Sequence, residues 1–340
     1  MAEAILYQRV PGGAVRCALC AHRCVIAEGG RGRCGVRTLR GGVLETLTYG
    51  RVVASGVDPI EKKPLFHFLP GSSSFSVATV GCNFSCANCQ NHEIAQPSRG
   101  IQEELGEPIA PTEIVDAARR AGCASIAYTY TEPTVFLEFA LDTSREGCRQ
   151  GLLNVFVSNG FMTREALDAI APTLDGINID LKAARPSFYR DVVGGVLRPV
   201  LRSIERCVEH GIWVEVTTLV IPGMNDSERE LRRTARRIAR ISPDIPWHIS
   251  RFFPAHRLRH LPATPIETLR RAADLGREVG LRYVYVGNVP GEGEDTRCPA
   301  CGEIVIRRHG YCVIRNALQG GCCAVCGHAI PGRWASSDGP

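Results

Sequence analysis

The chain has 340 residues, 44% of them hydrophobic, and a formal net charge of +5. This length exceeds that of one typical domain, so we expect one large catalytic domain with smaller appendages. No run reaches the ~18 uninterrupted apolar residues of a membrane span, and the first ten residues lack the apolar stretch of a secretory signal. These features argue against a membrane-spanning or secreted protein and predict a soluble, cytoplasmic one.

The charge and cysteine content narrow the function classes further. Five arginines alternate with apolar residues along one predicted helix: Arg232, Arg233, Arg236, Arg237 and Arg240. No aromatic side chains are interleaved with them, so a solvated helix face explains this pattern better than a nucleic-acid-binding patch. The 16 cysteines fall mostly into clusters spaced like metal ligands, which fits a reducing cytosol better than a disulfide-bonded secreted protein.

Residues 1–73 form a predicted cysteine-rich head. Its cysteines follow a C-x2-C-x3-C-x9-C pattern within a stretch rich in glycine and arginine, and they are Cys17, Cys20, Cys24 and Cys34. Four cysteines this close together indicate a metal site. Zinc and an iron–sulfur cluster both fit the spacing, which does not separate them. Zinc is the preferred interpretation.

The most informative motif of the chain follows a strand-like stretch. Cys82, Cys86 and Cys89 form a C-x3-C-x2-C trio in the run GCNFSCANCQN. A structural zinc site needs four ligands, usually two C-x2-C knuckles, and no partner knuckle lies near the trio in the sequence. A [4Fe–4S] cluster held by three thiolates leaves one iron open to a non-protein ligand. We therefore predict such a cluster here, with zinc or three buried thiols as the alternatives.

Residues 74–290 form the predicted catalytic core, in which short β-rich runs alternate with amphipathic helical stretches. This alternation predicts parallel strands joined by helices. The strands are expected at residues 75–80, 125–128, 153–157, 176–181, 212–220, 247–252 and 281–286. Six or seven such units are too few for a complete eight-unit barrel, so we predict an α/β fold with a partial, open (β/α)6-type TIM barrel. Its active site would lie at the carboxyl ends of the strands.

Polar residues suited to ligand binding lie at or just past the ends of several of these strands. They are Glu132, Ser158, Asn159, Asp180, Lys182 and His248. A turn, a helix cap or, for the histidine, a satisfied core position explains each of them singly. Such local explanations do not account for their recurrence at the same end of successive strands. We therefore expect them to line one site.

Residues 291–340 form a predicted tail of the zinc-ribbon type. Its candidate ligands belong to two C-x2-C knuckles, each followed by glycine, and they are Cys298, Cys301, Cys323 and Cys326. Cys322 competes with Cys323 as a ligand, but the C-x2-C-G form favours Cys323. So short a segment cannot bury enough apolar surface to fold alone. We expect zinc to stabilise the tail and the tail to take no direct part in the chemistry.

With these motifs in place, the chain resembles the radical S-adenosylmethionine (SAM) superfamily, on the branch that includes pyruvate formate-lyase activating enzymes. It is more similar still to the AmmeMemoRadiSam system radical SAM enzymes. The matching runs are residues 58–71, 81–91, 128–134 and 285–291, and both cysteine-rich appendages match as well. Asn88 is a departure, because the residue before the third cysteine is usually aromatic and packs near the adenine. The contact with the base then falls to another residue, such as Phe84.

The resemblance implies that SAM binds the open iron of the cluster through its amino and carboxylate groups. Glu132 would lie where the SAM amino group is received, with the Ser158-Asn159 pair beside the ribose and carboxylate. Lys182 would pair with the methionyl carboxylate, and Asp180 with a ribose hydroxyl or with Lys182 itself. His248 would reach the ribose or adenine edge. The implied reaction is reductive cleavage of SAM to methionine and a 5′-deoxyadenosyl radical, which abstracts a hydrogen atom from a substrate.

The resemblance also implies AMMECR-type and Memo-type partner proteins and an electron donor such as flavodoxin or ferredoxin. The sequence does not name the substrate. One alternative function is that of an activase, which places a radical on a glycine of a large partner enzyme. Another is a zinc-ribbon nucleic-acid-binding or scaffold protein with a structural cluster, and the dispersed arginines count against it.

Overall fold

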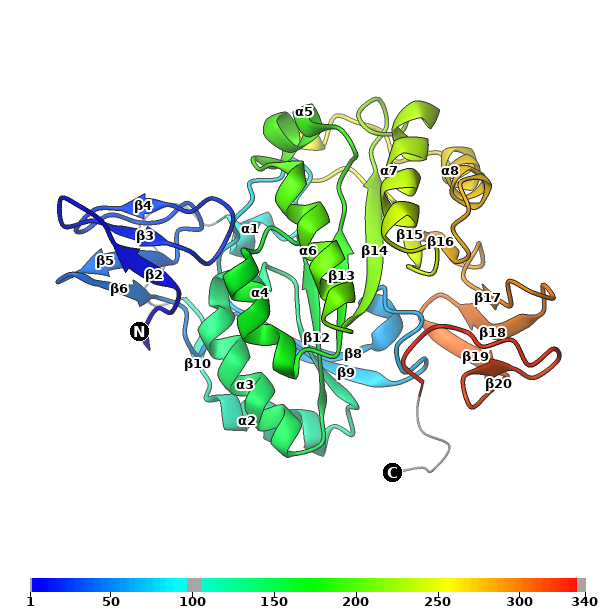
Figure 1. Cartoon of the computed structure of the whole chain (residues 1–340), viewed down its shortest axis with the longest axis horizontal. Coiled ribbons are helices and arrows are strands. Elements are labelled where there is room, and N and C mark those ends of the chain that lie inside the picture. The colour runs from blue at the N-terminus through cyan, green and yellow to red at the C-terminus, as the bar shows by residue number, and fades with distance from the viewer. Residues whose placement is uncertain (1, 97–104, 335–340) are drawn as a thin grey trace.

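The computed structural model describes residues 2–96 and 105–334, and one eight-stranded sheet lies at its centre (Figure 1). Seven strands run parallel and in chain order: β9 (Ser73–Ala78), β11 (Ser125–Tyr128), β12 (Leu153–Ser158), β13 (Gly176–Asp180), β14 (Trp213–Val220), β15 (Trp247–Arg251) and β16 (Val284–Gly287). All seven strands predicted from the sequence are therefore present. The sheet keeps two open edges, so it does not close into a complete barrel.

The eighth strand, β8 (Ala54–Pro59), pairs antiparallel with β9 at one edge of the sheet. The sequence did not predict it, because its residues are mainly small and polar and include a proline, a composition that disfavours strands. The edge position explains the difference, since proline is tolerated there. β8 ends beside the start of β9, because Pro59 pairs with Ser73, and the segment that follows it contributes side chains of residues 61–66 to a cavity described below.

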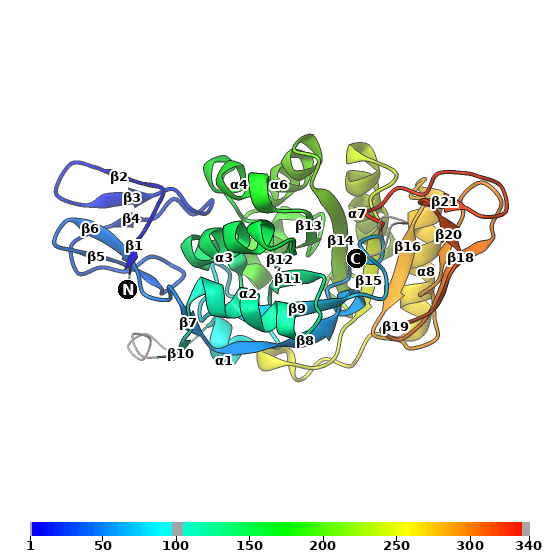
Figure 2. The same cartoon turned by 90° about the horizontal axis from the view of Figure 1, so that it is seen from below.

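Six helices form one continuous layer against the sheet (Figures 1 and 2). They are α2 (Pro111–Arg120), α3 (Leu137–Arg149), α4 (Arg164–Ile170), α6 (Leu197–Glu209), α7 (Glu228–Ile241) and α8 (Ile266–Glu278). Each contacts the next in chain order. One face of α7 is buried through Leu231, Ala235 and Ile238. The arginines lie on the other face, where Arg232 forms an ion pair with Glu278 of α8 at 2.7 Å, as predicted for a solvated helix face. None of the helices in the described part of the chain is long and apolar enough to cross a membrane.

Shorter elements complete the core. The short helices are α1 (His92–Ala95) and α5 (Pro186–Phe188), and single 3₁₀ or π turns occur at Ile60–Lys62, Pro133–Phe136, Ala171–Thr173, Tyr189–Val193 and His256–Leu258. β7 (Arg51–Val52) pairs with β10 (Glu107–Pro108). These elements mostly connect the strands to the helical layer.

Residues 2–46 of the predicted head form two small three-stranded sheets at the opposite end of the molecule from the tail, whereas β8 shows that the rest of it leads into the core (Figure 1). One holds β2 (Tyr7–Arg9), β3 (Val15–Cys17) and β4 (Val25–Ile26), and the other β1 (Ala2–Glu3), β5 (Arg37–Arg40) and β6 (Val43–Thr46). A buried ion pair between Arg37 and Glu138 of α3 joins the head to the core. The hydroxyl of Thr163 also donates to the Ala18 carbonyl at 2.6 Å. The head is thus fixed against the helical layer.

The tail holds a three-stranded sheet of β17 (Thr296–Arg297), β18 (Ile304–His309) and β19 (Cys312–Asn316), and a pair of β20 (Leu318–Gln319) and β21 (Cys322–Cys323). It shares a hydrophobic cluster with the core, in which Phe66 and Tyr285 pack with Val305, Ile306 and Ile330 of the tail. The tail therefore shares buried apolar contacts with the core, which stabilise it in addition to any metal ion that it binds.

His67 lies at the centre of this joint between core and tail and is fully buried. Its backbone N–H donates to Glu215 at 2.7 Å, and its ring nitrogens lie 2.7 Å from the Pro331 carbonyl and 2.6 Å from the Tyr285 hydroxyl. Burial lowers the pKa of His67 to about 4, although the Glu215 carboxylate opposes this effect. The folded protein therefore holds a neutral His67.

This burial predicts a loss of stability in mild acid. Below the ordinary pKa of 6.5 the unfolded chain protonates His67 while the folded chain does not, so the stability is lost as the pH falls from 6.5 toward 4. From pH 7 to pH 5 this group alone should remove about 2 kcal/mol. Urea unfolding of the wild type and of His67→Asn at both pH values measures this effect. Between pH 7 and pH 5 the free energy of unfolding should fall less in the variant than in the wild type, by about the contribution of His67. An equal loss in both proteins would contradict the assignment.

Candidate active site

The cysteine trio lies on the loop that follows β9, with its side chains partly buried. The N–H of Phe84 donates to the sulfur of Cys82 at 3.4 Å. Burial raises the pKa of Cys86 to about 11 and holds that of Cys82 well above its ordinary value. Buried thiols do not ionise unless a positive group compensates the charge, so the trio fits metal ligation better than free nucleophiles.

The spacing of the trio also fits a cluster better than a single ion. Among the residues that the structure describes, the thiols gathered closely enough to share one ion are those of the tail, and the trio is not among them. This is expected where each thiolate binds a different iron of a [4Fe–4S] cube. The donor set is therefore compatible with an iron–sulfur cluster.

A cavity of about 510 Å³ opens beside the trio at the carboxyl ends of the strands. Its lining includes all three cysteines of the trio and all six polar residues singled out in the sequence: Glu132, Ser158, Asn159, Asp180, Lys182 and His248. This volume lies within the usual range for small-ligand sites. The structure thus places the predicted residues around one space, although it does not test the role of each.

Glu132 is buried at the end of β11, and its carboxylate already has several donors. Oε1 accepts from the Thr134 N–H at 3.0 Å and from the Ser158 hydroxyl at 2.8 Å, while Oε2 accepts from the Asn159 N–H at 2.8 Å. The side-chain amide of Asn159 in turn donates to Oδ1 of Asn83, the residue after Cys82, at 2.7 Å. Through these hydrogen bonds Glu132 connects the segment after β11 to the end of β12, and Asn159 connects both to the trio loop.

Asp180 and Lys182 form an ion pair at the end of β13, with 2.5 Å between Nζ and Oδ2. Burial works against the charge of Lys182, but the carboxylate of Asp180, joined by Cys86 when it is a thiolate, outweighs burial and raises the lysine pKa. The lysine is therefore a fixed cation beside the trio. Of the two partners predicted for Asp180, the structure shows Lys182.

His248 lies on β15 and is 2% exposed, with its Nε2 2.6 Å from Oε2 of Glu215. Its ring packs against Phe66 and Tyr285, with centroid distances of 4.7 and 5.1 Å. Glu215 is fully buried and also accepts from the backbone N–H groups of residues 66 and 67. His248 thus lines the cavity as part of a satisfied buried network, which favours the core interpretation over a free ligand contact.

Sequence reasoning missed a charged group beside this cavity, of which Lys62, Lys63 and Tyr130 belong to the lining. Asp58 accepts from Lys62 and Lys63, each at 2.6 Å, and also from the hydroxyl of Tyr130. The ammonium of Lys63 lies 4.8 Å from the centroid of the Tyr130 ring. Tyr130 has a left-handed backbone, with φ of +62°, which is costly for a tyrosine and typical of functional loops. Both lysines lie in the run 58–71, but no role was predicted for it.

The tail also reaches this cavity. Tyr311, at the turn between β18 and β19, belongs to its lining. The sequence predicted a tail without a direct part in the chemistry. The structure does not test the chemistry, but it places a tail side chain on the wall of the same space.

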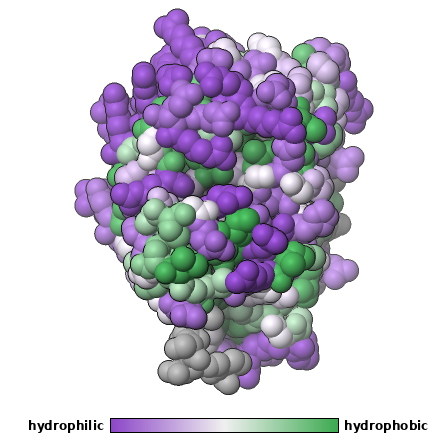
Figure 3. Space-filling model, turned by 90° about the vertical axis from the view of Figure 1, so that its right-hand side faces the viewer, coloured by the Kyte–Doolittle hydropathy of each residue, from purple (hydrophilic) through white to green (hydrophobic). Residues whose placement is uncertain are grey.

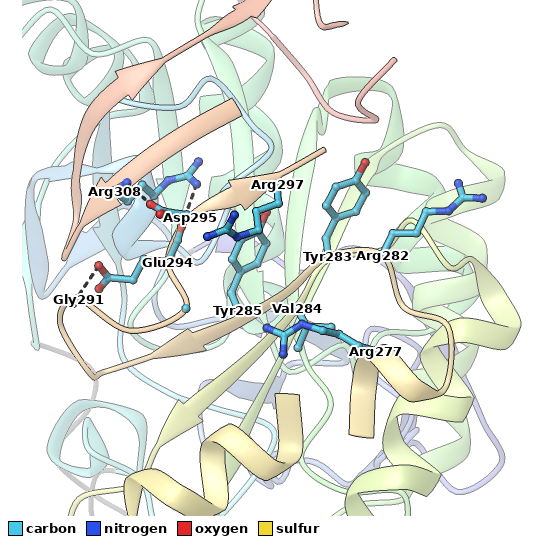
Figure 4. A pocket seen from close by; sticks show the side chains of 11 residues that line it. Arg277, Arg282, Tyr283, Val284, Tyr285, Gly291, Glu294, Asp295, Arg297 and Arg308 are labelled. Atoms are coloured by element: carbon cyan, nitrogen blue, oxygen red, sulfur yellow. Dashed lines mark hydrogen bonds between the residues drawn. The ribbon is translucent and has the colours of Figure 1, made fainter. Parts of the chain in front are cut away.

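A second cavity, of about 300 Å³, lies between α8, β16 and the start of the tail (Figure 4). Arginines dominate its lining, but Arg282 pairs with Asp244 at 2.7 Å and Arg277 with Asp274 at 3.1 Å. None of the cysteines or of the six predicted polar residues belongs to it. The predicted site residues therefore line the first cavity and not this one.

Comparison with known proteins agrees with this geometry. The sequence profile of the Radical SAM superfamily matches residues 76–235. An uncharacterized protein of Methanocaldococcus jannaschii is 43% identical over 336 residues, which cover 97% of this chain and 99% of that protein. The chain belongs to the radical SAM superfamily. It is a radical SAM enzyme, which sets aside a purely structural role for the cluster.

Solved structures show the same fold. A radical SAM methyltransferase from Sphaerobacter thermophilus superposes with a TM-score of 0.51 at 18% identity, covering 64% of this chain and 67% of that one. The Streptococcus suis protein SuiB bound to S-adenosylmethionine gives a TM-score of 0.51 at 11% identity, covering 67% and 53%. Membership of the superfamily implies a [4Fe–4S] cluster and SAM as cofactors.

Proposed function

We propose that the trio holds a [4Fe–4S] cluster and that SAM binds beside it in the 510 Å³ cavity. One observation supports this most strongly: a single cavity gathers the three thiols, polar side chains from the carboxyl ends of three strands, and His248 of β15. When bound, the cluster would supply the electron that cleaves SAM to methionine and a 5′-deoxyadenosyl radical, which abstracts a hydrogen atom from a substrate. The core would then be a partial barrel with its site at the carboxyl ends of the strands.

The residues of the chain would bind and orient SAM and exclude water. Lys182, fixed by Asp180, offers a cation for the methionyl carboxylate. Glu132 holds the Ser158-Asn159 pair in place beside the ribose. Because Glu132 already accepts several hydrogen bonds, we assign it to positioning these two residues, with the SAM amino group as an additional donor to Oε2. Phe84, buried on the wall of the cavity, would face the base.

Replacing Lys182 by methionine should weaken SAM binding by about 10- to 100-fold, the worth of one charge-assisted hydrogen bond. Calorimetry on the reconstituted protein measures this affinity, and iron content should not change. Lys62→Met is the matched control, because Lys62 lines the same cavity but pairs with Asp58. Equal affinities in the two variants would mean that the methionyl carboxylate binds elsewhere.

We infer a place in the AmmeMemoRadiSam system from the matching sequence runs, with AMMECR-type and Memo-type partners. A flavodoxin or ferredoxin would deliver the electron. The surface of the tail supports the proposal of a protein partner. Apolar side chains gather over the tail, while the surface above it is hydrophilic (Figure 3). Ile314 is 61% and Val325 70% exposed on the tail. Exposed apolar groups of this kind favour protein interfaces.

We propose a structural zinc ion in the tail. The sulfurs of Cys298, Cys301, Cys323 and Cys326 lie within 4.8 Å of one another, and Cys298 is 3.6 Å from Cys326. A tetrahedron with Zn–S bonds of about 2.3 Å has sulfur separations of about 3.8 Å. The four thiols are thus arranged for one ion.

The choice between the adjacent cysteines 322 and 323 gives a direct test. Cys323→Ala should lose one zinc per chain, because Cys323 belongs to the four-sulfur set. Cys322→Ala should keep it, since the sulfur of Cys322 instead lies 3.9 Å from the Gly320 carbonyl. Zinc is counted by elemental analysis of the purified protein. Retention in the first variant, or loss in the second, would overturn the assignment.

A further inference from the structure

The four head cysteines form a second thiol group outside the proposed SAM site. Cys17, Cys24 and Cys34 all lie close enough to Cys20 to interact with it electrostatically, so the four cysteines form one group. The N–H of Cys17 donates to the carbonyl of Cys24 at 2.9 Å, so the hairpin of β3 and β4 brings both together. None of the four is in a disulfide.

The head and tail sets differ in how closely their sulfurs gather. The tail sulfurs lie within 4.8 Å of one another, with pairs at 3.6 and 3.7 Å, as a single tetrahedral ion requires. Among the residues that the structure describes, this is the only such set, so the head sulfurs are spread more widely. A wider set suits a polynuclear centre, in which each thiolate binds its own iron.

The surroundings of the head sulfurs also suit an anionic cluster. Nη1 of the buried Arg37 lies 3.8 Å from the sulfur of Cys17, and the same guanidinium pairs with Glu138 of the core. Cys17 itself is buried. Hydrogen bonds to sulfur and exclusion of solvent are the features by which proteins stabilise and tune iron–sulfur clusters.

The segment of the head that carries Cys34 lies directly against the loop that carries the trio. A side chain built on Gly81, the residue before Cys82, would meet Val36 at 2.6 Å and the carbonyl of Cys34 at 3.2 Å. The head also reaches the residue after Cys82, because Nε2 of His22 lies 2.7 Å from the Asn83 carbonyl. The polypeptide around the head cysteines is thus in direct contact with the residues on both sides of Cys82.

We propose that Cys17, Cys20, Cys24 and Cys34 bind a second iron–sulfur cluster next to the trio, in place of the zinc that was the preferred interpretation of the sequence. The site is distinct from the SAM cavity, because none of the four cysteines lines that cavity. The proposal does not rest on SAM cleavage. It assigns the head to redox chemistry and leaves the tail as the zinc site.

Metal analysis and electron paramagnetic resonance of the full chain, purified and reconstituted without oxygen, test this proposal. The variant Cys82→Ala/Cys86→Ala/Cys89→Ala should keep up to about four irons per chain, together with a reducible cluster signal. Adding Cys24→Ser and Cys34→Ser should remove that iron and signal. In the wild type reduced at both sites, the spectrum should be broadened relative to the sum of the single-cluster spectra, because the two centres are adjacent.

Cys312→Ala is the matched control, since Cys312 is an exposed thiol on β19 and should leave all iron in place. A trio variant that contains no iron and two zinc ions per chain would overturn the proposal, because the head would then hold zinc. The trio variant does not touch the head, so the result does not depend on whether head variants fold. Failure of the wild-type chain to cleave SAM, with head iron still present in the trio variant, would refute the proposed function and leave this inference intact.

Discussion

Cys86→Ala is expected to abolish formation of 5′-deoxyadenosine from SAM while the chain still folds. Each thiolate of the trio binds one of the four irons, and the fourth iron has no protein ligand. Removing one thiolate therefore destabilises the whole cluster, and the open iron is lost with it. Cys86 lies on a loop beside the cavity, not within the helical layer or sheet. Circular dichroism should therefore remain that of the wild type. Product formation is measured by chromatography after anaerobic reconstitution and reduction.

The control for this prediction is Cys148→Ala, which removes an exposed thiol on α3 far along the chain from the trio. It should retain iron content and product formation. Product formation by Cys86→Ala at the rate of the control would be incompatible with ligation of the cluster by the trio.

Arg308→Met is expected to destabilise the protein by about 3–5 kcal/mol, the usual cost of breaking a buried ion pair. Its guanidinium is fully buried, 3.6 Å from Glu61, and it donates to the Phe66 carbonyl at 2.6 Å. It also lies 4.3 Å from the centroid of the Phe66 ring. Without it, Glu61 is a buried carboxylate without its cation. Burial already raises the pKa of Glu61.

Arg307→Met provides the matched control, because Arg307 is the exposed neighbour on the same strand. It should change the free energy of unfolding by less than about 0.5 kcal/mol. Arg308→Met/Glu61→Gln should recover part of the loss, since it removes the unpaired charge. Equal unfolding free energies for the two single variants, measured in urea on the metal-loaded protein, would show that the joint between tail and core does not depend on Arg308.

Much of the core could be predicted from the sequence because its signals are local. Apolar strands such as residues 153–157 and 247–252 are short, buried and regularly spaced, and the structure confirms all seven. The convergence of Glu132, Asp180 and Lys182 on one cavity followed from their positions at strand ends, since parallel strands present these ends at one edge.

The missed features depend on contacts between residues far apart in the chain. The pairing of Asp58 with Tyr130 requires β8 to lie at the sheet edge, which its polar composition hid. Glu215 is the charged residue of the otherwise uncharged strand β14. A buried carboxylate needs hydrogen-bond donors, but the sequence around Glu215 does not show which residues supply them. Tyr311 reaches the cavity because the tail packs on Phe66, a contact that no spacing of cysteines could reveal.

The most direct test of the central claim is the stoichiometry of SAM cleavage by the reconstituted wild-type chain under a strong reductant. We predict 5′-deoxyadenosine and methionine in equal amounts, formed only when the protein carries iron. Full iron loading at the trio with SAM recovered intact, or with products that lack 5′-deoxyadenosine, would contradict the proposed function.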